Sequence, residues 1–167
     1  MTFIREWIVP GLTTALVAWI FIPTIPAEPV SYDNLAVGQH RTCALEGRIM
    51  PSPRGWYPPE QFAPLIPSAG GTMRVIDAHE CAGSMAFTHL IVEAAGGDKA
   101  SILVTRSPEG GERTLRRRFR DFEVTQVRTT RRRAFIVVDW KQSRALRHWR
   151  EATTERMRQF LRQSEGS

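Results

Sequence analysis

The sequence lacks the short motifs by which most catalytic and cofactor sites are recognised. The glycine pairs at residues 96–97 and 110–111 are not followed by the Lys-Ser/Thr of a phosphate-binding loop. Ser84 stands in AGSMA, which is not a nucleophile elbow. No Cys-x-x-Cys-His haem attachment sequence occurs. These absences argue against an enzyme, and we expect no catalytic residue and no cofactor.

Charge is missing from the 21 residues between Trp7 and Ala27. A helix of that length rises about 30 Å, enough to cross the hydrocarbon layer of a membrane. The sequence therefore predicts a transmembrane anchor at residues 1–27, and a cleaved signal peptide is the alternative. Arg5 precedes the run, whereas Glu28 and Asp33 follow it before the next cation. The positive-inside rule then predicts a single-pass inner-membrane protein with a cytoplasmic N-terminus and a periplasmic main domain.

Lysine is scarce in the last part of the chain, and arginine takes its place. In residues 101–167, sixteen of the seventeen basic residues are Arg, and they stand against eight Asp and Glu. Such a field attracts acidic protein faces or anionic lipid headgroups, and nucleic acid is not expected outside the cytoplasm. A merely solvated charged surface is the alternative. The candidate partner-binding residues are Arg113, Arg116, Arg117, Arg118, Arg120, Arg131, Arg132 and Arg133.

After the anchor, the hydrophobic pattern predicts an α+β domain. Residues 28–40 are polar and irregular and predict a tether, and residues 41–167 predict one extracytoplasmic domain with a mainly antiparallel sheet. Residues 50–71 are rich in proline and predict mostly loop, and residues 107–120 predict a long charged loop. The expected strands are 41–49, 72–80, 86–94, 100–106, 121–129 and 133–140.

A helix is expected at the end of the chain, from about Gln142 to Arg162. Its apolar residues recur at helical spacing, which predicts an amphipathic helix that packs on the sheet and closes the core. The alternative is a basic helix that lies on anionic headgroups. The stripe consists of Leu146, Trp149, Thr153, Met157, Phe160 and Leu161.

Cysteine occurs only twice, as Cys43 and Cys81, so the chain can form at most one internal disulfide. An oxidising exterior favours that bond. Two further hypotheses stay open: a pair of unlinked buried thiols, or a tetrahedral zinc or copper site. His40 and Cys43 lie in HRTC, and His79 and Cys81 lie in DAHEC, where alternation along a strand puts both side chains on one face. His89 is more typical of a satisfied core or edge histidine.

Several strand sequences resemble the outer domain of bacterial membrane-anchored anti-sigma-factor-like proteins. In that family a similar His-x-Cys strand is followed by strands like those at Phe87–Leu90, Ser101–Arg106 and Ala134–Asp139. Family members carry a sigma-binding domain before the membrane span, whereas six residues precede Trp7 here. The resemblance therefore implies the outer module alone.

Together these patterns predict a non-enzymatic accessory or scaffolding subunit. Its helix would sit in the lipid bilayer, and its Arg-rich domain would dock on subunits of a larger membrane complex, respiratory or photosynthetic. The alternative is an extracytoplasmic redox- or metal-sensing regulatory module built around His79, Cys81 and their neighbours.

Overall fold

The computed structural model describes residues 31–49, 51–57, 62, 64–66, 73–81, 87–106, 111–139, 141 and 144–165. These residues belong to one compact unit that begins at Ser31. The expected anchor at residues 1–27 lies outside the described residues. Among the helices that are described, none is long and apolar enough to span a bilayer.

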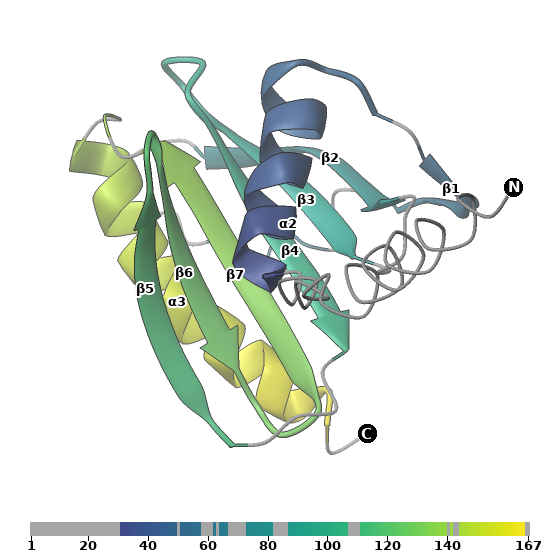
Figure 1. Ribbon diagram of the computed structural model, residues 1–167, viewed down its shortest axis with the longest axis vertical. Coiled ribbons are helices and arrows are strands. Elements are labelled where there is room, and N and C mark those ends of the chain that lie inside the picture. Colours follow the sequence, from purple (N-terminus) through teal and green to yellow (C-terminus); the bar gives the residue numbers. More distant parts are fainter. Residues whose placement is uncertain are drawn as a thin grey trace, which may run out of the picture. The chain divides into compact units, whose positions relative to one another are not determined.

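A single antiparallel sheet forms the middle of the domain (Figure 1). In the described part of the chain it has seven strands in the order β1-β2-β3-β4-β7-β6-β5. The last three strands are ordered β5, β6, β7 from the far edge of the sheet toward its centre, so β7 pairs with β4. The strands are β1 (Pro51–Trp56), β2 (Met73–Cys81), β3 (Thr88–Ala94), β4 (Lys99–Arg106), β5 (Arg113–Phe119), β6 (Phe122–Arg128) and β7 (Arg132–Asp139).

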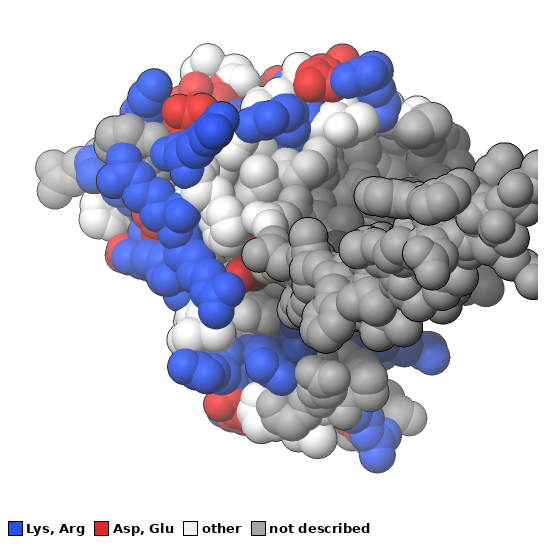
Figure 2. Space-filling view, viewed as in Figure 1, with Lys and Arg blue, Asp and Glu red and all other residues white. Residues whose placement is uncertain are grey.

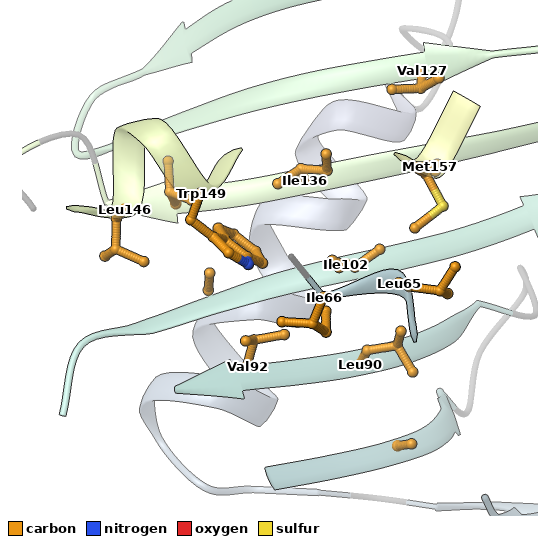
Figure 3. Packing of buried hydrophobic residues seen from close by; sticks show 14 of the residues in the cluster. Leu65, Ile66, Leu90, Val92, Ile102, Val127, Ile136, Leu146, Trp149 and Met157 are labelled. Carbon is orange, nitrogen blue, oxygen red and sulfur yellow. The ribbon is translucent and has the colours of Figure 1, made fainter. Parts of the chain in front are cut away.

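One face of the sheet is covered by helix α3 (Arg144–Gln163). Trp149, Met157 and Leu161 are fully buried on its inner side. They meet alternate residues of the strands, among them Leu90 and Ile102 (Figure 3). The C-terminal amphipathic helix and its packing on the sheet are thus confirmed, and so is the α+β class.

The other face is covered by helix α2 (Tyr32–Gln39), which continues directly into a π-helical stretch, η1 (His40–Leu45) (Figure 1). Ala36 and Ala44 are fully buried there. Small side chains at these positions let the helical backbone approach the sheet closely. The strand residues beneath are large and apolar: Phe87, Ile91, Leu103, Phe122, Val124, Phe135 and Val137.

The secondary structure predicted for residues 32–49 was wrong, and residues 28–30 lie outside the described residues. Residues 32–39, expected as part of an irregular tether, are helical, and the strand expected at 41–49 is instead η1 followed by loop. The β propensity of residues 41–49 is outweighed by the burial that a helical segment gains on the apolar face of the sheet. The expected metal-ligand candidates His40 and Cys43 therefore reach the sheet from a helix rather than from a strand.

Two further strands lie where loops were predicted. β1 falls in the proline-rich segment, and it lies at an edge of the sheet, where a missing N–H is tolerated. β5 falls in the charged segment 107–120 and forms the opposite edge. Its exposed arginines hide the alternation that marks a strand, and charged residues are a common way to protect a sheet edge. The remaining strands expected at 72–80, 86–94, 100–106, 121–129 and 133–140 are confirmed.

Replacing Trp149 tests how much of the stability comes from the α3 face. Trp149→Ala removes the largest buried side chain of the helix, and we expect the free energy of unfolding to fall by about 3–5 kcal/mol. Denaturant unfolding of the full-length chain in mild detergent measures this loss. His148→Ala, at the exposed neighbouring position, is the control and should change stability by less than about 0.5 kcal/mol. Equal losses in the two variants would contradict the packing described here.

Candidate metal centre

Two adjacent strands bring three metal-binding side chains together. His79 and Cys81 are two residues apart on β2, so both face the α2 side of the sheet. The antiparallel register places His79 directly opposite His89 of β3. Their ring centroids are 5.0 Å apart. A β-hairpin with this register therefore presents a thiol and two imidazoles on one face.

The fourth side chain comes from the helical layer. Cys43 lies in η1, and its sulfur completes a cluster with His79, Cys81 and His89. The four ligand atoms all lie within 4.8 Å of one another, and all four residues are buried. The cluster thus joins residues that are far apart in the sequence.

The distances inside the cluster suit one tetrahedral ion. Cys81 Sγ is 3.5 Å from His89 Nδ1 and 3.8 Å from His79 Nε2. A tetrahedral zinc ion with usual Zn–S and Zn–N bonds places its sulfur and nitrogen ligands about 3.6 Å apart. The cluster therefore has the size that a single bound ion requires.

Each histidine of the cluster is held by a hydrogen bond on its outer nitrogen. His79 Nδ1 lies 3.1 Å from Asp77 Oδ1, and His89 Nε2 lies 2.7 Å from Ser101 Oγ. Metal-binding histidines characteristically donate their second N–H to such a partner, which orients the ring. With these protons on the outer nitrogens, His79 Nε2 and His89 Nδ1 offer lone pairs to the centre of the cluster.

His40 supports the cluster from one step further out. Its Nδ1 is 2.7 Å from Ser101 Oγ. Since Ser101 accepts from His89, its own hydroxyl proton is available to His40 Nδ1, and the remaining His40 proton then lies on Nε2. That nitrogen has no hydrogen-bond partner among the described residues, and the ring meets Phe122 edge-on at 5.3 Å. His40, expected as a candidate ligand, therefore lies outside the cluster. It contacts Ser101, which in turn contacts His89.

The pKa values of the two thiols shift in opposite directions. A hydrogen bond from Cys81 lowers the pKa of Cys43 to about 3, although burial opposes the shift, and hydrogen bonds from His79 and His89 add to it. The same bond to Cys43, together with burial and the negative charge on Cys43, raises the pKa of Cys81. Metal binding displaces the thiol protons, so the affinity of the cluster for an ion depends on pH.

The pKa values of the buried imidazoles shift in different directions. Burial lowers the pKa of His89, and burial together with the nearby His89 lowers the pKa of His40 to about 3. Burial acts on His79 in the same direction, but hydrogen bonds to Cys43 and Asp77 and their negative charges outweigh it, so the pKa of His79 is raised. His89 therefore gives up a proton more readily than His79 when a metal ion binds.

The structure brings together three of the four candidates named from the sequence. Cys43, His79 and Cys81 belong to the cluster, His40 lies behind it, and His89 takes the fourth position. The register that sets His89 opposite His79 is the signal that could have identified His89 as a ligand. Cys43 and Cys81 are both free thiols in this structure. A disulfide between them stays a prediction.

The candidate partner-binding arginines lie in different surroundings. Five of them are exposed on β5 or in the turn that follows it: Arg113, Arg116, Arg117, Arg118 and Arg120. Arg131 is exposed and Arg132 is half-buried. Arg133 is only 6% exposed, and its guanidinium lies 4.3 Å from the ring centroid of Tyr32. The exposed positions thus concentrate on one edge of the sheet.

Comparison with protein-family models, with curated proteins and with solved structures found no match for this chain. The resemblance to the outer domain of anti-sigma-factor-like proteins stays a prediction. The arguments for function therefore come from the geometry of the cluster and from the charged surface.

The neutral state of His40 predicts how stability depends on pH. Its pKa is about 3 in the folded protein against about 6.5 in the unfolded chain, so the unfolded state binds the extra proton as the pH falls. Stability is then lost below about pH 6.5, by about 2 kcal/mol between pH 7 and pH 5. In metal-free protein, His40→Gln should lose about 2 kcal/mol less than the wild type over this range.

Denaturant unfolding of the full-length chain at the two pH values checks this difference. The glutamine amide can still accept the hydroxyl proton of Ser101. His148→Gln changes an exposed histidine and should keep the pH dependence of the wild type. An unchanged slope in His40→Gln would mean that His40 is charged in the folded protein.

Proposed function

We propose that this domain binds one zinc ion through Cys43, His79, Cys81 and His89 and serves as an extracytoplasmic metal- or redox-sensing regulatory module. The observation that carries the proposal is the convergence of four buried ligand atoms within 4.8 Å. Two thiols and two imidazoles form a Cys₂His₂ set, which is a common zinc-binding combination.

Charge balance favours a divalent ion. Two thiolates and two neutral imidazoles carry a net charge of −2, which Zn²⁺ neutralises and monovalent copper does not. A net charge is costly in a buried site, and all four ligand residues are buried. Among divalent ions, zinc binds such a set more tightly than ferrous iron.

The site is closed rather than catalytic. Four protein ligands fill a tetrahedral coordination shell and leave no position for a reacting water. The cluster is also buried. These features support a structural or regulatory role and agree with the expectation that the protein is not an enzyme.

The thiols give the site sensitivity to oxidants. If Cys43 and Cys81 lose two electrons to hydrogen peroxide, a disulfide forms between their sulfurs, the peroxide is reduced to water and two zinc ligands are lost. Their sulfurs lie within the 4.8 Å cluster, so a modest movement brings them into bonding distance. The disulfide expected from the sequence and the metal site are then two states of one pair of cysteines.

Metal analysis of the full-length chain tests the proposal. We expect one zinc per chain after purification in mild detergent and an intense visible spectrum of tetrahedral, thiolate-bound cobalt after exchange. Cys81→Ser and His89→Asn should each weaken metal binding at least tenfold. His148→Asn replaces the histidine on α3 outside the cluster and should bind like the wild type. Wild-type protein with neither bound zinc nor a cobalt spectrum would refute the proposal.

A second candidate function is docking on a larger membrane complex as an accessory subunit. It is favoured by the exposed arginines of β5, which Figure 2 shows gathered along one side of the domain. β5 is an edge strand, so both its charges and its open edge face solvent. An acidic surface on a partner subunit would match this strip. The inner-membrane anchor and the periplasmic orientation belong to this proposal as well.

Charge reversal on β5 tests the docking function. Arg113→Glu combined with Arg118→Glu should abolish co-purification of a membrane complex that the tagged wild type retains in mild detergent. Arg147→Glu, on the exposed side of α3, is the control and should leave co-purification unchanged. Retention of the same complex by the double variant would exclude this edge as the docking surface.

A further inference from the structure

The segment formed by α2 and η1, residues 32–45, covers its face of the sheet with apolar side chains that are only partly buried, namely Tyr32, Leu35 and Val37. Its fully or almost fully buried residues are Asp33, Ala36, His40, Cys43 and Ala44. On the other face, α3 buries a tryptophan, a methionine and two leucines. The eight residues of α2 are also too few for a helix that is stable by itself.

Polar contacts hold this segment along its length. At the start, Asp33 Oδ2 accepts from Arg117 Nη1 at 3.1 Å. In the middle, His40 contacts Ser101 at 2.7 Å. At the end, Lys99 donates to the Ala44 carbonyl at 3.0 Å. Such contacts contribute less than a buried apolar stripe, so the docking of the segment is open to adjustment by one strong additional link.

The proposed metal centre supplies such a link. Three of its ligands, His79, Cys81 and His89, lie on the paired strands β2 and β3 and are positioned by that pairing. Cys43 is the ligand that the segment contributes. It lies in a π-helical stretch, a rare conformation that tends to occur at functional sites. One coordinate bond therefore connects the helical layer to the hairpin.

We propose that zinc binding clamps residues 32–45 onto the sheet and that zinc loss frees this segment to undock. The inference rests on the proposed function, because it states the structural consequence of zinc binding at the same site. α2 begins immediately after residues 1–31, which include the expected membrane anchor. Undocking uncovers the apolar strand residues beneath the segment.

Linkage makes the effect reciprocal. If docking strengthens zinc binding, zinc strengthens docking by the same factor. A change that lowers the docked fraction of the zinc-free protein therefore lowers zinc affinity in proportion to that fraction, even when it leaves every ligand in place. Arg117→Ala removes the ion pair with Asp33, whose side chain is 7% exposed. We expect zinc affinity to fall about twofold to fivefold. Arg74→Ala removes an ion pair between β2 and β3, outside this segment, and is the matched control with unchanged affinity.

Hydrogen exchange of the full-length chain with and without zinc tests the clamp directly. In the zinc-free protein, amides of residues 32–45 should exchange at least about tenfold faster, while those of α3 and β7 change little. Cys43→Ser leaves three ligands on the hairpin, and its residues 32–45 should exchange fast even when zinc is added. The comparison of the wild type with and without zinc needs no variant, so it stands if Cys43→Ser does not fold.

The possible outcomes separate the two proposals. If zinc binds and protects residues 32–45 no more than α3, the clamp is refuted and the metal site stands. If zinc slows exchange in every element equally, the ion stabilises the domain as a whole and the clamp is again refuted. If the wild type binds neither zinc nor cobalt, the metal site is refuted and the clamp with it.

Discussion

The antiparallel register between β2 and β3 is the constraint on which the site depends. It sets His79 opposite His89 and leaves Cys81 beside both rings. A shift by one residue would turn His89 to the α3 face, where its ring would meet the apolar core. The Cys81 amide, which donates to the Phe87 carbonyl at 2.9 Å, closes the end of this pairing. Asp77, on the same strand as His79, orients that imidazole, and the pairing of β3 with β4 places Ser101 beside His89.

The central strands and the last helix could be predicted from the sequence. Strands β3, β4, β6 and β7 are short, largely buried runs, and the stripe of α3 has a clear helical period, so their patterns located them. β5 escaped prediction because an edge strand with solvated arginines lacks such a buried run. Residues 41–45 escaped because a six-residue π-helical stretch follows no simple period and is set by what it covers.

The candidate site could be predicted in part for a related reason. Cys43, His79 and Cys81 stood out by residue type and by the spacing within β2. His89 did not, since its role comes from a partner across the hairpin rather than from its own neighbours in the chain. His40 has a residue type that suits a ligand, and only the position of Ser101 between two histidines shows that it acts one step further out.

The two faces of the sheet differ in how strongly their helical layers are held. The α3 face is a conventional apolar core, in which Trp149 and Leu161 bury large side chains against the strands. The α2 face has an apolar floor, and its cover combines the partly buried Tyr32, Leu35 and Val37 with alanines, polar contacts and one thiol. A ligand bound at the thiol therefore acts on the weaker layer while the stronger layer keeps the sheet intact. Under the proposed clamp, this asymmetry would allow one ion to change the position of a helix without unfolding the domain that binds it.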